Sequence, residues 1–174
     1  PIVPPRREEQ RPIHLVVDAE LVAAVVAAGG DPNGSDRIGR TALFQAARGD
    51  ERLVRALLEA GSDARVVDSE GATALHEAGT EGIAIALLAA GALVGARAER
   101  DVTPLHLAST ATVARALIRA GAEVDCRDAS GATPLMNACV MGSVEVVEEV
   151  LRSGADVTLA NNVGDTSCHL AAGW

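Results

Sequence analysis

Residues 128–138 read Asp-Ala-Ser-Gly-Ala-Thr-Pro-Leu-Met-Asn-Ala, a turn followed directly by the start of a helix. Asp128 can bond to its own backbone, and Gly131 can supply the positive φ that a tight turn requires. Thr133 can cap the helix, and Pro134 suits the first helical turn, where an N–H is not needed. The segment therefore predicts a projecting turn joined to a short helix.

A second helix follows after a break at residues 141–143. Its apolar residues occur at i, i+1, i+4 and i+5, which places them on one helical face. They are Val146, Val147, Val150 and Leu151. Gly154 is placed to end this helix in a left-handed conformation. Neither helix can bury its apolar face alone, so the unit has to stack on a neighbouring unit.

The same unit recurs along the chain. The glycine that ends the second helix recurs with spacings of 32, 30, 30 and 33 residues, at Gly29, Gly61, Gly91, Gly121 and Gly154. The threonine that begins the first helix keeps step with it, at Thr41, Thr73, Thr103, Thr133 and Thr166. Two landmarks in register predict a stacked repeat architecture. The units that begin near residues 68 and 98 are shorter between their helices, so we expect a curtailed first helix there.

These landmarks resemble the ankyrin repeat family, whose pattern is Asp-x-x-Gly-x-Thr-Pro-Leu-His-x-Ala. Residues 128–138 match it with Met136 in place of His, and residues 103–108 match its helical part fully. The resemblance implies an all-α ankyrin-repeat solenoid of stacked helix-turn-helix units with projecting β-turn or hairpin fingers. Residues 98–101 depart from the pattern, because they lack both the turn Asp and its Gly. We expect Asp101 to adopt the left-handed conformation there, and this finger to be reshaped.

The predicted organisation is a lead segment at residues 1–10, expected to be flexible, and an ankyrin repeat domain at residues 11–174. His14 marks a degenerate helix start in the first repeat. The chain lacks an initiator Met and stops at Trp174 inside a repeat, which indicates a piece of a longer protein. Without a following second helix, the segment around Leu170 is expected to fray. The repeats are expected at about 11–35, 36–67, 68–97, 98–127 and 128–160, with a partial repeat at 161–174.

Composition argues against several classes of function. The formal net charge is −9 with no basic stripe, which disfavours nucleic-acid binding through phosphate contacts. The longest weakly polar run, residues 83–96, is 14 residues long and too short for membrane insertion. Cys126, Cys139 and Cys168 match no zinc spacing, and we expect them to be reduced, with Cys139 buried in the repeat core. An intracellular location, cytoplasmic or nuclear, is therefore predicted.

The histidines invite a metal or catalytic interpretation, which the resemblance opposes. His76, His106 and His169 occupy the Thr-Pro-Leu-His position of the family, where the ring bonds backbone groups between repeats. Asn33 occupies a position that is hydroxylated in some family members, but no other repeat carries Asn there. No phosphate-binding glycine loop and no nucleophile–base arrangement is visible. We therefore predict no enzyme activity, no metal, no cofactor and no small-molecule substrate.

The predicted binding surface uses residues that the apolar helix faces do not require. The finger tips contribute Arg37, Arg40, Ser69, Glu70, Glu99, Arg100, Ala129, Ser130 and Asn162. The concave face of the first helices contributes Gln45, Arg48, Glu77, Leu107, Asn137, Val140 and Met141. Leu107 and Met141 are expected to be exposed apolar anchors. Reversal of Arg37, Arg40 and Arg48 to Glu is expected to weaken partner binding without lowering the melting temperature.

The leading hypothesis is a non-catalytic interaction module, or adaptor, that binds another protein or a domain of the same full-length chain. The alternative is a regulatory or substrate-recognition ankyrin domain of a larger multidomain protein such as a ubiquitin ligase. A third hypothesis, a purely structural spacer, predicts no specific partner. The sequence beyond Trp174 would discriminate between the first two, because fold alone does not name a partner.

Overall fold

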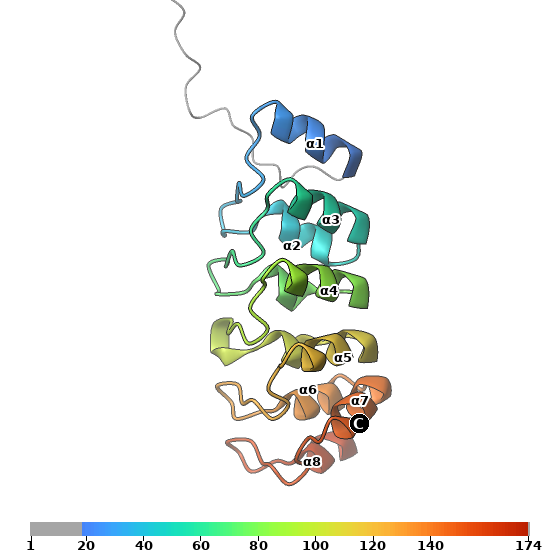
Figure 1. Ribbon diagram of the computed structural model, residues 1–174. Coiled ribbons are helices and arrows are strands. Elements are labelled where there is room, and N and C mark those ends of the chain that lie inside the picture. The colour runs from blue at the N-terminus through green and yellow to red at the C-terminus, as the bar shows by residue number, and fades with distance from the viewer. Residues whose placement is uncertain (1–18, 174) are drawn as a thin grey trace, which may run out of the picture.

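The computed structural model describes residues 19–173, which form a column of short helices (Figure 1). These residues contain no β-strand, and their β-pairing is limited to isolated bridges from Ser35 to Thr41 and from Ala160 to Thr166. The expected all-α solenoid is therefore confirmed for this part of the chain, whereas the lead segment and His14 lie outside it. The α-helices are α1 (Ala19–Ala27), α2 (Ala42–Ala47), α3 (Glu51–Glu59), α4 (Glu81–Ala89), α5 (Ala111–Arg119), α6 (Pro134–Val140), α7 (Val144–Arg152) and α8 (Ser167–Ala172). The 3₁₀ helices are η3 (Ala74–Glu77), η4 (Glu99–Asp101) and η5 (Pro104–Leu107).

Consecutive helices pair into layers, and the layers stack. The pairs are α2 with α3, η3 with α4, η5 with α5, and α6 with α7. The first helices form one row, in which α2 contacts η3, η3 contacts η5, η5 contacts α6 and α6 contacts α8. The second helices α1, α3, α4, α5 and α7 form a parallel row. The turns between layers project from one edge of the column as fingers, on the left in Figure 1.

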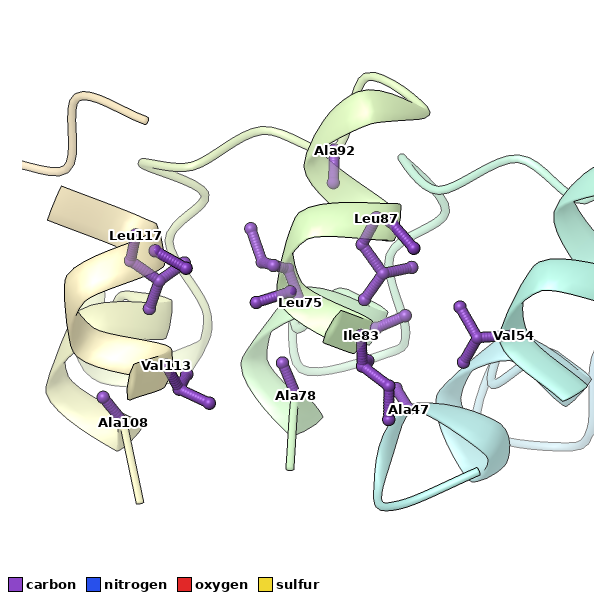
Figure 2. Close-up of a cluster of buried hydrophobic side chains, with 14 of the residues drawn as sticks. Ala47, Val54, Leu75, Ala78, Ile83, Leu87, Ala92, Ala108, Val113 and Leu117 are labelled. Atoms are coloured by element: carbon purple, nitrogen blue, oxygen red, sulfur yellow. The ribbon is translucent and has the colours of Figure 1, made fainter. Parts of the chain in front are cut away.

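The core is built from equivalent residues of successive layers. The first helices α2, η3, η5 and α6 each bury one leucine almost completely, and these are Leu43, Leu75, Leu105 and Leu135. The second helices bury the apolar residues that the periodicity placed on one face, including Val54, Ile83, Leu87, Val113, Leu117 and Val150. The side chains labelled in Figure 2 come from three successive layers and include Ala47 and Val54, then Leu75, Ile83 and Leu87, then Val113 and Leu117. Every inner layer is therefore covered on both sides by its neighbours.

Leu21 and Leu151 of the predicted apolar faces are exposed. Leu21 on α1 is 53% exposed and Leu151 on α7 is 41% exposed. Among the described elements, α1 packs mainly against α3, and α7 has no second helix stacked beyond it. The helical periodicity predicts both residues on the apolar faces, but burial also requires a neighbouring layer on each side.

The first helix is curtailed in the two shorter layers, as expected. η3 and η5 are single turns of four residues, whereas α2 and α6 have six and seven. The following helix begins after three residues, as in the longer layers, with the Oγ1 atoms of Thr80 and Thr110 accepting from N–H groups in its first turn. Gly79 permits this connection to lie close to the preceding layer, because a Cβ there would collide with the carbonyl oxygen of Arg48. Its N–H donates to the carbonyl oxygen of Ala47.

The fingers follow the predicted turn chemistry. One carboxylate oxygen of Asp128 accepts from the N–H groups of Ser130 (2.8 Å) and Ala132 (2.9 Å), and Gly131 has a φ of 76°. Adjacent fingers are also bonded to each other, since the N–H of Asn162 donates to the carbonyl oxygen of Ser130 (2.9 Å). The turn geometry is therefore supported within each finger and across the stack.

One finger departs from this geometry. Asp101 has a φ of 60° in place of the usual glycine, as expected, but Arg100 is also left-handed, with a φ of 61°. No other non-glycine residue of 19–173 has a positive φ. The finger is held from outside, because Arg97 Nη1 donates to the carbonyl oxygens of Asp101 (3.4 Å) and Arg127 (3.1 Å). Its shape therefore carries local backbone strain.

The strain predicts that Asp101→Gly stabilises the protein by about 1 kcal/mol, because glycine adopts a positive φ without the Cβ penalty. Thermal and urea unfolding of the variant measure this change. Gly131→Asp is the reciprocal control and should destabilise, since its Cβ would collide with the Asn162 side chain. A lower unfolding midpoint for Asp101→Gly would contradict the assignment of strain.

Candidate protein-binding surface

His76 and His106 connect one layer to the next. The backbone N–H of Thr73 donates to Nδ1 of His76 (3.0 Å), and Nε2 of His76 lies 3.2 Å from the carbonyl oxygen of Val102. Because Nδ1 accepts, Nε2 carries the proton and donates to that carbonyl. His106 repeats the arrangement one layer further along, with Nε2 at 3.1 Å from the carbonyl oxygen of Ala132. The expected bonds between repeats are therefore confirmed for both rings.

The folded state holds these two rings in the neutral form. Burial is the main cause that lowers the pKa of His76 and of His106 below the ordinary value of 6.5, and it outweighs the bonds to carbonyl oxygens. A proton on Nδ1 would also remove the acceptor of the threonine N–H. His169 makes the same bond to the N–H of Thr166 (3.2 Å) but lies exposed. No group of three potential metal ligands occurs within residues 19–173.

Arg40 is part of the scaffold rather than a free finger-tip charge. Its Nε donates to Oδ2 of Asp68 in the next finger (2.9 Å), and the Asp68 side chain is only 1% exposed. Burial raises the pKa of Asp68, but the hydrogen bond from Arg40 and the N–H groups of Glu70 and Ala72 outweigh it and hold the pKa below its usual range. The structure thus corrects the expectation that Arg40 can be reversed without loss of stability.

Arg48 is also paired, although it stays more exposed. Its Nε and Nη2 contact the two carboxylate oxygens of Glu77 at 3.1 and 3.4 Å. Gln45 lies exposed beside this pair on α2. Gln45 and Arg48, together with residues of the first described finger, line a pocket of about 170 Å³. Its lining is Asp36, Ile38, Arg40, Thr41, Phe44, Gln45 and Arg48.

The side chains at the remaining finger tips are of two kinds, those bonded within the fold and those without such a bond. Ser130 Oγ donates to Asp128 Oδ1 (2.7 Å), and Asn162 Nδ2 donates to the carbonyl oxygen of Ala129 (3.1 Å). These polar groups therefore support the turns. By contrast, the side chains of Arg37, Glu99 and Arg100 are exposed and make no hydrogen bond or ion pair within the part of the chain that the structure describes. Ser69 and Glu70 are also exposed, at the tip between those fingers.

Three apolar side chains are exposed on the first helices. Leu107 on η5 and Val140 on α6 are each 44% exposed, and Met141, which caps α6, is 60% exposed. The exposure expected for Leu107 and Met141 is confirmed. Because η5 packs against α6, these residues lie in adjacent layers. Asn137, half-buried on α6, completes the predicted helix positions.

Two exposed apolar residues of the fingers are absent from the binding surface predicted from the sequence. Ile38 and Val163 lie in finger turns and have exposed side chains. Ile38 aligns with Glu70 and Ser130, which the prediction includes, and Val163 also aligns with them. Superposition of the repeats position by position would therefore have found both.

A family model for "Ankyrin repeats (3 copies)" matches residues 13–98 and 84–161. The chain belongs to the ankyrin repeat family. No curated protein matches the sequence significantly. Ankyrin repeats are in general protein–protein interaction modules and are typically non-catalytic.

The cysteines of this ankyrin repeat chain occupy three different environments. Cys126 is buried, and Thr103 Oγ1 lies 3.5 Å from its sulfur. Cys139 is half-buried rather than buried as expected, because no second helix covers it after α8 in the described residues. Cys168 is exposed. Together with Cys139 it lines a hollow of about 180 Å³. Burial raises the pKa of the Cys126 and Cys139 thiols, which opposes a reactive thiolate there.

Asn33 has a structural role between ankyrin repeats. Its side-chain Nδ2 donates to the carbonyl oxygen of Gly61 (3.2 Å), and its Oδ1 accepts from the N–H of Asp63 (2.7 Å). The amide therefore ties together the loops that follow two successive second helices.

No helix within residues 19–173 has the length and apolar character needed to cross a membrane.

We predict that Arg40→Glu destabilises the protein by about 2–3 kcal/mol, because it leaves the buried Asp68 carboxylate unpaired and facing a like charge. Arg37→Glu makes the same charge change at an exposed tip with no internal partner and should leave stability unchanged. Urea unfolding compares the two variants. Equal unfolding midpoints would show that the Arg40–Asp68 bond does not support the stack.

The lowered pKa of His76 and His106 predicts a loss of stability at mildly acidic pH. Below about pH 6.5 the unfolded chain binds protons that the folded rings exclude, so the free energy of unfolding falls as the pH falls. Above that pH the full stability is present. Thermal unfolding from about pH 7.5 to about pH 5.5 should show a falling midpoint.

The double variant His76→Gln, His106→Gln is the control for this pH dependence and should show a weaker one. The pKa values of Asp68 and Asp128 are lowered, so their contribution is lost only below the ordinary value of 3.8, outside this window. An unchanged pH profile in the double variant would exclude the two rings as its source.

Proposed function

We propose that this chain is a non-catalytic interaction module that binds another protein, or another domain of its own full-length chain. The observation that supports this most directly is the exposure of Leu107, Val140 and Met141 on adjacent first helices. Exposed apolar side chains with polar surroundings favour association with another protein surface, because burial of their area on binding is favourable. The contact face would comprise the finger tips and the exposed side of the first helices.

Free charges at the finger tips support specificity at this face. Arg37, Glu99 and Arg100 have no internal hydrogen bond or ion pair among the described residues, so a partner can engage them without breaking a bond of the scaffold. Exposed charges of this kind steer association and select orientation more than they add affinity. Arg40, Ser130 and Asn162 are bonded within the fold and would contribute by holding the shape of the fingers.

The proposed organisation keeps the repeat limits expected from the sequence, with the domain spanning residues 11–174. The unpaired thiols of Cys126, Cys139 and Cys168 support an intracellular location. The overall charge of −9 supports a protein rather than a nucleic acid as partner. A substrate-recognition role within a larger protein, such as a ubiquitin ligase, would use the same face.

The chain contains no Lys, so biotin can be attached through its α-amino group alone and leaves the contact face unmodified. We expect the immobilised protein to retain a binding protein from a cell lysate, and the variant Leu107→Gln, Met141→Gln to lose it. Both residues are substantially exposed, so the variant should keep the thermal midpoint of the parent. Retained proteins are identified by mass spectrometry.

Ile85→Gln is the matched control for this capture, because Ile85 is 50% exposed on the second helix α4, away from the first helices. It should retain the same partner. A partner that is retained equally by all three proteins would place binding elsewhere, and the absence of any specific partner would contradict the proposed function.

A further inference from the structure

The finger at residues 98–101 keeps an arginine where glycine would be favoured. Arg100 has φ 61° and ψ 27°, and the N–H of Asp101 donates to the carbonyl oxygen of Ala98 (3.0 Å) to close the turn. The equivalent residues of other fingers, such as Glu70 and Ser130, do not have a positive φ, a conformation that glycine adopts without the Cβ penalty. Every other positive φ in residues 19–173 belongs to glycine, apart from Asp101 beside it. The side chain of Arg100 is thus present despite a backbone that disfavours it.

The guanidinium of Arg100 is not used inside the protein. It is exposed and makes no hydrogen bond or ion pair within residues 19–173, although Glu99 and Asp101 flank it. The Asp101 carboxylate lies 3.8 Å from Arg97 instead. No bond within the described residues therefore engages the Arg100 side chain, and an unpaired guanidinium is well suited to bind a carboxylate through two parallel hydrogen bonds.

Apolar anchors accompany this cation in the same and the next layer. Leu107 lies on η5, the first helix that follows the finger of Arg100, and η5 packs against α6, which ends at Met141. The finger is tied to the next one, because the N–H of Ala129 donates to the carbonyl oxygen of Arg100 (2.7 Å). One cation and two exposed apolar side chains are therefore presented by neighbouring layers that are bonded together.

We propose that this strained finger presents Arg100 to a partner, and that the partner is a protein segment with two features. It places an Asp or Glu carboxylate against the Arg100 guanidinium and an apolar side chain against Leu107 and Met141. This inference rests on the proposed function, and it adds the chemical character of the partner. The positive charge of Arg100 and the apolar character of the adjacent helices determine that character.

A displayed library of random peptides tests the proposal. The library uses peptides of about twelve residues, which span up to about 40 Å when extended. We expect the parent protein to enrich peptides with Asp or Glu near Leu, Ile, Met or Phe. Arg100→Glu should enrich Lys or Arg at the acidic position, and Leu107→Gln, Met141→Gln should lose the apolar preference. Arg52→Glu, the same charge change at an exposed site on the second helix α3, should select the parental peptides.

A second variant separates the side chain from the backbone. Arg100→Gly should raise the thermal midpoint, since it relieves the strain, yet weaken binding of the peptide selected by the parent by about tenfold or more. Unchanged affinity in Arg100→Gly, or the same peptide consensus with Arg100→Glu, would overturn the inference while leaving the proposed function standing. If no peptide is enriched over the Leu107→Gln, Met141→Gln variant, both the inference and the proposed function fail.

Discussion

Every part of this structure depends on the fact that a single layer cannot bury its own apolar faces. The buried leucines of α2, η3, η5 and α6 and the apolar faces of the second helices are covered only when another layer lies on each side. The exposure of Leu21 and Leu151 at the ends of the described stack shows the same constraint from the opposite direction. Stability is therefore shared between neighbours, and a change in one layer acts on the next.

Hydrogen bonds and an ion pair between layers hold the stacked layers in alignment with one another. The His76 and His106 rings reach the carbonyl oxygens of the following layer, and the finger backbones are bonded in series. The pair Arg40–Asp68 has the same role at a finger. Burial of these groups is tolerated because each has a partner, and loss of one partner leaves the other unsatisfied. Several residues that the sequence suggests are available for binding are therefore bonded within the fold.

What remains for binding is the set of side chains that neither the core nor these bonds require. Leu107, Val140 and Met141 are exposed although apolar, and Arg37 and Arg100 are charged although unpaired. The finger at residues 98–101 combines such a side chain with an unfavourable backbone. Where local rules are broken in an otherwise consistent fold, a functional reason is the first explanation to test.

The sequence by itself determined the repeat, the helix pairs and the shortened first helices, because these follow from local periodicity and spacing. It also identified Asp101 as left-handed and Leu107 and Met141 as exposed, since each occupies a recognisable repeat position. It did not distinguish Arg40, bonded to buried Asp68, from Arg37, which is free. It also missed the left-handed Arg100, the exposed Ile38 and Val163, and the partial exposure of Cys139. Arg40 and Cys139 were decided by the tertiary structure, because pairing and burial depend on which residues of a neighbouring layer lie opposite. Arg100 depends on the turn geometry adopted once the layers are stacked.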